Sequence, residues 1–321
     1  MGLAEAGAWM TEHPRKLKRY QVARDITYAA SAQTRMGRAV IRLLENTTGR
    51  LSLIRRAEGY EDQVAAGHDF WQVMCDRYGL KINYHGAGLE GIPEAGPLIL
   101  IANHPFGILD GLIMGHILSQ RRGGDFRILA HQIFRKAPDL ERIILPVSFD
   151  ETKEAVAQNI TTRKAAFSYL DQGGAIGIFP GGTVSTAAKP FGVPMDPDWR
   201  VFTARMVARS GATVIPIFFE GQNSRLFQIM SHIHVTLRMG LLIREFRKRM
   251  KVPLEVTVGR PISRQDMAAH LDNPPALMDF LRSETYRLSQ TPIDPRLRGF
   301  EFDQKRLAKR HERQEDGGRH I

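Results

Sequence analysis

The sequence predicts an α/β protein with a mixed, mostly parallel sheet covered by helices, preceded by an N-terminal helical region. Seven short apolar runs recur after residue 80, each as long as a buried strand, and helical patterns lie between several of them. Hydrophobic residues form 43% and charged residues 25% of the 321-residue chain, as in ordinary folded proteins. The single cysteine, Cys75, excludes a disulfide framework and a multi-cysteine zinc site within one chain.

The first 79 residues are predicted as a basic, mostly helical region. After a polar, weakly patterned stretch over 1–14, helical periodicity covers 16–78, and 63–78 form the clearest helix. Apolar side chains at helical spacing lie there among arginines: Met36, Val40, Ile41 and Leu44. This pattern is typical of an amphipathic helix on a membrane, and equally of a helix docked on the protein core.

The α/β domain is predicted over 80–295. Its strands are expected at 81–85, 97–103, 126–131, 142–149, 174–179, 213–219 and 254–259. Its helices are expected at 110–120, 151–171, 199–210, 225–250 and, after Asn273-Pro274-Pro275, from about 275 to 290. Strands that alternate with helices favour a sheet covered on both faces. The remaining residues, 296–321, are predicted as a charged tail.

The excess positive charge is concentrated in three segments. Residues 1–60 carry 11 basic and 5 acidic side chains, 225–251 carry 7 and 1, and 296–321 carry 8 and 5. Because the whole chain has a net charge of +11, the rest of it carries −4. Basic segments suit a polyanion, either nucleic acid or an anionic membrane. No nucleic-acid-binding motif is recognisable, whereas the first two segments contain amphipathic patterns, so we expect a membrane surface and no nucleic acid.

The sequence contains no run of 18 apolar residues and no signal-peptide pattern at its N-terminus. We therefore expect a peripheral protein on the cytoplasmic face of the membrane.

The motifs of three other protein classes, dinucleotide-binding proteins, serine hydrolases and P-loop NTPases, are incomplete or missing. The G-x-G-x-x-G match from Gly86 to Gly91 lacks the helix that dinucleotide binding needs, because Pro93 and Pro97 follow it. Neither a G-x-S-x-G elbow nor a P-loop occurs.

A histidine and an aspartate lie where a buried strand is predicted to end. Pro105 keeps His104 extended, Gly107 lets the chain turn, and Asp110 opens the next helix. Ligand sites of open α/β sheets lie at the carboxyl ends of strands, where His104 is expected. Such a histidine can accept a proton near neutral pH while a carboxylate holds its other nitrogen. Alternatively, Asp110 only caps the helix, worth about 1 kcal/mol, and the residues alone leave both interpretations open.

Four stretches together resemble the glycerolipid (lysophospholipid) acyltransferase family, typified by 1-acylglycerol-3-phosphate acyltransferase. In order, they are Asn103-His-Pro-Phe-Gly-Ile-Leu-Asp-Gly111, Ile143-Ile-Leu-Pro-Val-Ser-Phe149, Ile178-Phe-Pro-Gly-Gly-Thr-Val-Ser185 and Val214-Ile-Pro-Ile-Phe-Phe-Glu-Gly221. Five residues separate His104 from Asp110 where the family usually has four, and Gly181 and Val184 replace the usual Glu and Arg of the third stretch. The longer spacing and the missing Glu resemble a hemolysin-like branch of the family.

The resemblance implies transfer of a fatty acyl group from acyl-CoA or acyl-acyl-carrier protein to the hydroxyl of a lyso-lipid. His104 would be the general base and Asp110 would orient it, with no metal or other cofactor. Substrate contacts are expected from Asn103, Phe106, Gly107, Gly181, Gly182, Thr183, Ser185 and Pro216, of which Pro216 is expected to shape its strand at an edge or bulge.

Two acceptor classes stay open: a lysophospholipid, and a lyso-aminolipid such as lyso-ornithine lipid. The replaced Glu and Arg argue against lysophosphatidic acid. The expected partners are an anionic membrane surface, the lyso-lipid and an acyl carrier protein. A catalytically silent membrane- or nucleic-acid-binding protein is the alternative from another class, and the intact His104 and Asp110 argue against it.

Overall fold

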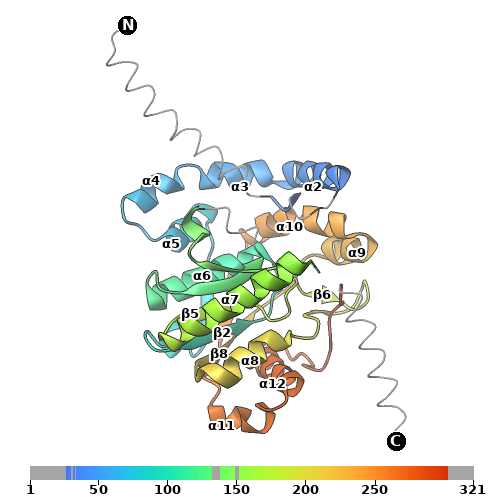
Figure 1. Ribbon diagram of the computed structural model, residues 1–321. Helices are drawn as coiled ribbons and strands as arrows, with labels where there is room; N and C mark the ends of the chain where they lie inside the picture. Colours follow the sequence, from blue (N-terminus) through green and yellow to red (C-terminus); the bar gives the residue numbers. More distant parts are fainter. Residues whose placement is uncertain (1–26, 30–31, 33, 132–137, 149–151, 303–321) are drawn as a thin grey trace, which may run out of the picture.

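The computed structural model describes residues 27–29, 32, 34–131, 138–148 and 152–302. The predicted polar ends, 1–14 and 303–321, and the last residue of the predicted 142–149 strand lie outside these ranges. Within them, the centre of the molecule is a seven-stranded sheet (Figure 1) with the order β1-β9-β8-β2-β5-β3-β4. Its strands are β1 (Ile82–Gly86), β2 (Leu98–Ala102), β3 (Arg127–His131), β4 (Ile144–Val147), β5 (Ala175–Ile178), β8 (Thr213–Phe219) and β9 (Leu254–Val258).

The predicted mixed, mostly parallel sheet is confirmed. Only the β8–β9 pair is antiparallel among the described strand pairs of this sheet. Each of the seven predicted apolar runs overlaps one strand, and only β1 extends beyond its run, by one residue. A second, two-stranded sheet of β6 (Thr186–Ala187) and β7 (Pro194–Met195) was not predicted, because two-residue strands have no periodicity to detect.

Helices cover both faces of the sheet because its side chains alternate in direction. In β2, Leu98, Leu100 and Ala102 join the core beneath α5 and α6, whereas Ile99 and Ile101 join the core beneath α7, α8 and α12. The helices are α2 (Arg35–Thr48), α3 (Arg50–Ala57), α4 (Tyr60–Ala65), α5 (Phe70–Tyr78), α6 (Ile108–Arg122), α7 (Lys153–Asp171), α8 (Val201–Ser210), α9 (Arg225–Ile233), α10 (Val235–Arg249), α11 (Arg264–Met267) and α12 (Pro274–Tyr286). Single 3₁₀ turns cover Leu89–Gly91, Pro138–Leu140 and Ala268–His270.

Two segments that were each predicted as one helix are divided into two helices in the structure. The predicted 63–78 helix is interrupted before Asp69, whose side chain accepts from the N–H of Gln72 and caps α5. The predicted 225–250 helix breaks at His234, which is extended with φ −162°. Its Nδ1 accepts from the N–H of Thr236 at 3.0 Å and so starts a new helix, α10.

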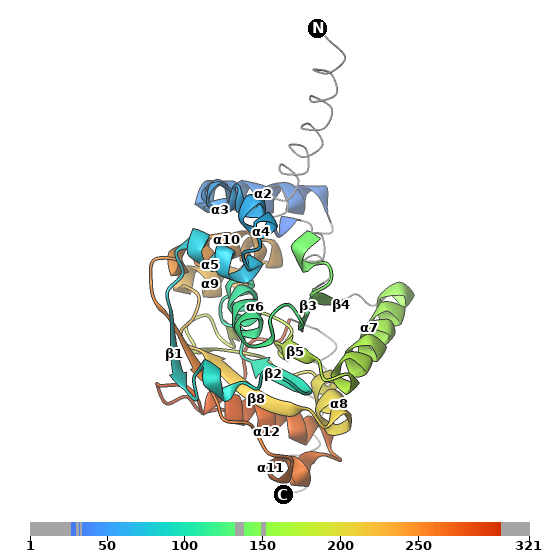
Figure 2. The same cartoon turned by 90° about the vertical axis from the view of Figure 1, so that its left-hand side faces the viewer.

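The N-terminal helices form an outer layer over α10. Figures 1 and 2 both show α2 and α3 on the side of α10 that faces away from the sheet. Ile41 is buried in the core, while Met36 keeps 78% of its surface exposed. The amphipathic pattern of this helix therefore serves docking on the core at Ile41 and leaves Met36 to solvent. Among the described residues, no helix is both long and apolar enough to cross a membrane.

Candidate active site

The histidine and aspartate predicted from the sequence meet at the carboxyl end of β2. His104 Nδ1 lies 3.0 Å from Asp110 Oδ2, and the Asp110 side chain is fully buried, while 18% of the His104 side chain is exposed. The imidazole stacks on the ring of Phe179, which follows the neighbouring strand β5, with 4.3 Å between centroids. One nitrogen of an accessible imidazole is thus held by a carboxylate, the arrangement that a general base needs.

The same carboxylate oxygen also caps α6. Asp110 Oδ2 accepts from the N–H groups of Phe106 at 2.8 Å and Gly107 at 3.0 Å. Asp110 Oδ2 therefore contacts the His104 imidazole and also caps the helix. Gly107 has φ +85°, and a Cβ there would lie 3.2 Å from Val184, so the turn favours glycine. Burial raises the pKa of the Asp110 carboxyl, while His104 and the two N–H groups act in the opposite direction.

Tyr28, which precedes α2, contacts the start of α6. The phenol of Tyr28 is buried, its pKa is raised by burial, and it hydrogen-bonds with the backbone of Ile108. Glu45 of α2 holds this segment, because it accepts from the Tyr28 N–H at 2.6 Å and from the Thr27 hydroxyl at 2.5 Å. The segment before α2, held by Glu45, therefore contacts the start of α6 just after the loop that carries His104.

Asn103 joins two strand ends. Its Nδ2 donates to the carbonyl of Phe219 at 3.0 Å, and its Oδ1 accepts from the Phe219 N–H at 2.8 Å. The side chain thus continues the β2–β8 pairing one step beyond the strands. Pro216 lies in β8 opposite Ile101. Of the edge or bulge expected for a mid-strand proline, the edge is wrong, because β8 is an interior strand. The proline is tolerated because β8–β9 pairing is interrupted between the Ile217–Val258 pair and the Val214–Ile262 bridge.

The loop over 181–185 lies against the His104 loop. The Ser185 N–H donates to the His104 carbonyl at 2.8 Å, and the Gly182 N–H donates to the Phe179 carbonyl at 3.0 Å. The Gly182 N–H is thereby used within the turn. The N–H of Gly181 has no acceptor among the described residues. Of the two glycines, Gly181 is therefore the better candidate to donate a hydrogen bond to an anion. Thr183 Oγ1 accepts from Arg238 at 2.9 Å.

Arg238 of α10 fixes this loop from behind. Its guanidinium is buried, and burial lowers its pKa to about 9. Its hydrogen bonds go to Thr183, Val184, Thr186 and Ser231. A sequence signal for this burial exists, because Arg238 falls on the same helical face as the apolar Leu241 and Leu242.

Asp196 is a second buried carboxylate behind the histidine, and no sequence motif indicated it. Its Oδ1 accepts from the His104 N–H at 3.2 Å and from the Ser185 hydroxyl at 2.5 Å, while Oδ2 accepts from Trp199 Nε1 at 2.9 Å. The predicted substrate-binding hydroxyl of Ser185 is thus occupied by Asp196.

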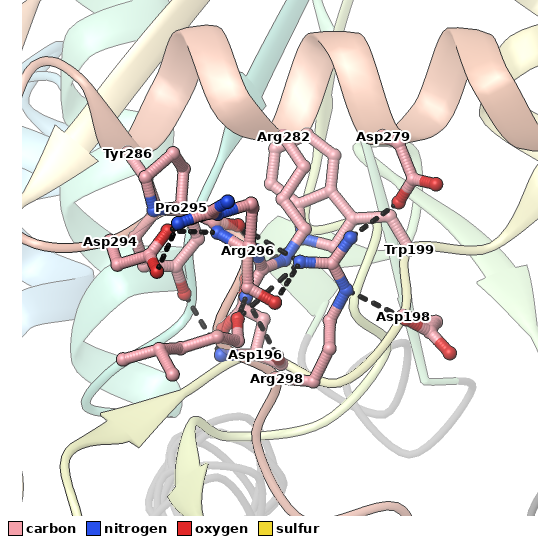
Figure 3. Close-up of polar contacts among 11 residues, drawn as sticks. Asp196, Asp198, Trp199, Asp279, Arg282, Tyr286, Asp294, Pro295, Arg296 and Arg298 are labelled. Carbon is pink, nitrogen blue, oxygen red and sulfur yellow. Dashed lines mark hydrogen bonds and ion pairs between the residues drawn. The ribbon is translucent and has the colours of Figure 1, made fainter.

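Figure 3 shows that α12 and the chain after it converge on Asp196. Arg282 donates to the Asp196 carbonyl at 3.0 Å and to the Leu297 carbonyl at 2.8 Å, and the Tyr286 hydroxyl accepts from the Asp196 N–H at 2.8 Å. The Gly299 N–H donates to the Asp196 carbonyl at 2.9 Å. Residues 296–302, which we predicted within the charged tail, therefore lie on the domain and support the site.

A family model described as "Acyltransferase" matches residues 54–289. The chain is similar to a lyso-glycine lipid O-acyltransferase of Phocaeicola vulgatus, 25% identical over 228 residues that cover 69% of this chain and 78% of the relative. A protein of the same name from Bacteroides thetaiotaomicron is 24% identical over 234 residues, covering 71% and 82%.

A solved structure was also matched, the 1-acyl-sn-glycerophosphate acyltransferase PlsC from Thermotoga maritima. The TM-score is 0.41 at 13% identity, with 87% of this chain and 100% of that chain covered.

Proposed function

The chain belongs to the acyltransferase family, and we propose that it transfers a fatty acyl group from a thioester donor, acyl-CoA or acyl-acyl-carrier protein, to the hydroxyl of a lyso-lipid. The observation that carries this proposal is the partly exposed His104 at the end of β2, with Nδ1 3.0 Å from the buried Asp110. The preserved contact between the two side chains also argues against a catalytically silent binding protein.

In the proposed mechanism, His104 Nε2 takes the proton of the acceptor hydroxyl as its oxygen attacks the thioester carbonyl. Asp110 fixes the orientation of the ring and stabilises the imidazolium that forms. A new ester C–O bond forms, the C–S bond breaks, and the imidazolium proton goes to the leaving thiolate. General-base catalysis contributes on the order of 10²–10⁴-fold. The free N–H of Gly181 is our candidate donor to the developing oxyanion. No metal or redox cofactor takes part in this mechanism.

We propose an amino-acid lipid as the acceptor, in preference to a lysophospholipid. The relatives that support this choice are both named lyso-glycine lipid O-acyltransferases. The loop over 181–185 also carries no charged side chain for the phosphate of lysophosphatidic acid. The test is competition between lyso-glycine lipid, lyso-ornithine lipid and lysophosphatidic acid for a labelled thioester. We expect the lyso-aminolipids to be acylated faster, and exclusive acylation of lysophosphatidic acid would contradict the choice.

We further propose that the protein reaches its acceptor from the cytoplasmic face of an anionic membrane. A surface patch supports this: Met36 and Leu43 of α2 and Ile233 and Val235 at the α9–α10 junction are 58–78% exposed. The close approach of Gly37 to Thr236 places the beginnings of α2 and α10 side by side. Exposed arginines flank the apolar side chains at Arg35, Arg38 and Arg42. Apolar side chains with adjacent basic groups are typical of interfacial helices.

A further inference from the structure

Arg249, the last residue of α10, places a positive charge beside the His104 loop. Its guanidinium carbon lies 4.4 Å from the centroid of the Phe106 ring. Phe106 follows His104 by two residues, and its N–H donates to the same Asp110 oxygen that contacts His104. The cation therefore lies on the ring of a residue whose backbone contacts Asp110, two residues from His104.

The chain after β8 makes room for this cation. Gly221 has φ +102°, and a Cβ there would lie 2.7 Å from Arg249 Nη2 and 3.2 Å from the Phe106 ring. The next carbonyl, that of Gln222, accepts from Arg249 Nη2 at 3.0 Å. Because β2 and β8 are neighbouring parallel strands, their carboxyl ends bring the two loops together under the guanidinium. The position of Arg249 is thus built by three separate segments.

Arg249 has no counter-ion within reach in the part of the chain that the structure describes. Among the described residues, no carboxylate oxygen lies within 4.0 Å of its guanidinium, and the hydrogen bond to the Gln222 carbonyl uses one of its five N–H groups. Its neighbour Arg244, in contrast, contacts Glu245 at 2.8 Å. Burial lowers the pKa of Arg249, and the charges of Asp110 and Glu245 oppose that shift. A half-buried guanidinium with free donors is suited to bind a carboxylate or phosphate in a bidentate manner.

We propose that Arg249 binds the anionic headgroup of the acyl acceptor, a carboxylate or a phosphate, while the acceptor hydroxyl lies at His104. This inference rests on the proposed function. The donor is the less suitable ligand, because a long pantetheine arm separates the phosphates of acyl-CoA and acyl-acyl-carrier protein from the thioester. A cation beside the His104 loop instead reaches a group close to the reacting hydroxyl. The loop over 181–185 has no charged side chain that could take this role.

The test compares Arg249→Gln and Arg249→Lys with the wild type in neutral detergent micelles, which remove the effect of membrane charge. The acceptors are lyso-glycine lipid, its carboxyl methyl ester, and lysophosphatidic acid. We expect Arg249→Gln to raise KM for lyso-glycine lipid by about 10- to 100-fold, as loss of a charged hydrogen bond predicts. KM for the methyl ester and for the donor should stay within about 2-fold, and Arg249→Lys should recover part of the loss.

Lys248→Gln is the matched control, because this neighbouring side chain is exposed and the variant loses the same charge. A larger KM effect on lyso-glycine lipid than on lysophosphatidic acid identifies a carboxylate as the ligand, and the reverse identifies a phosphate. An equal loss on the acid and its methyl ester, or a raised KM for the donor, would overturn the inference. If the wild type acylated none of the acceptors, the proposed function itself would fail, which is a distinguishable result.

Discussion

At the scale of single residues, Asp110 Oδ2 is shared between the start of α6 and the imidazole of His104. This sharing explains why one side chain fits both a capping and a catalytic pattern in the sequence. Both residues belong to one short loop, so local reasoning could find them. Asp196 could not be found in this way, because its contact with His104 joins residues 92 positions apart in the chain. Arg249 is hidden for the same reason.

Replacing Asp110 by Asn should separate catalysis from capping. Asn is also a good capping residue, so we expect the melting temperature to fall by only a few degrees. The neutral amide cannot stabilise the imidazolium, so kcat should fall by about 10²–10⁴-fold. Measuring kcat and thermal unfolding on the same preparation checks both parts. A variant that kept wild-type kcat would show that the carboxylate is only a cap.

Asp196 is expected to act as a positioning residue. In Asp196→Asn, the amide NH₂ must face one of the N–H or O–H donors now bound by the carboxylate, which costs about 1–3 kcal/mol. Because one of these donors is the His104 N–H, we expect kcat to fall about 10-fold or more with little change in KM for the acceptor. Asp198→Asn is the control: Asp198 contacts Arg298 instead, so its kcat should stay within about 2-fold. Equal kcat values for the two variants would contradict this role.

At the scale of elements, the seven strands were predictable because each is a buried apolar run bounded by turn residues. The break at His234 was not, since the residues on both sides continue a helical pattern and the new start depends on the His234 side chain itself. The strands β6 and β7 were not predictable either, because two residues are too few to show a hydrophobic periodicity. The ambiguity of the first amphipathic helix is resolved residue by residue: Ile41 packs inward and Met36 does not.

The exposed arginines of α2 should contribute to membrane binding. Basic residues near an anionic surface contribute about 1 kcal/mol each, so the Arg35→Gln, Arg38→Gln, Arg42→Gln triple variant should bind anionic liposomes markedly less well. Co-sedimentation over a salt series is the measurement, and binding should fall as salt rises.

The matched control removes three charges from the opposite end of the molecule, at Arg264, Arg287 and Arg296. Figures 1 and 2 both show α11 and α12 far from α2. This control variant should bind like the wild type. Equal binding of all three proteins to neutral and anionic liposomes, independent of salt, would contradict a role for this surface.

At the scale of the whole molecule, the site is assembled from parts distant in the chain. The β2 loop supplies His104, the loop after β5 packs against it, α10 supplies Arg238 and Arg249, and the segment after α12 supports Asp196 (Figure 3). The sequence predicted the sheet, its coverage by helices and the pairing of His104 with Asp110 at a strand end. It did not predict these supports, because nothing in a local pattern tells which distant segments will meet at a strand end.

The central claim is that His104 acts as the base in acyl transfer to a lyso-lipid. The most direct measurement compares wild type and His104→Ala in an assay with a labelled fatty acyl thioester and a panel of lyso-aminolipids and lysophospholipids, with thermal unfolding as the control for folding. We predict ester formation by the wild type and a loss of at least about 10²-fold in the variant at an unchanged melting temperature. Near-wild-type activity of His104→Ala with any of these acceptors would contradict the account.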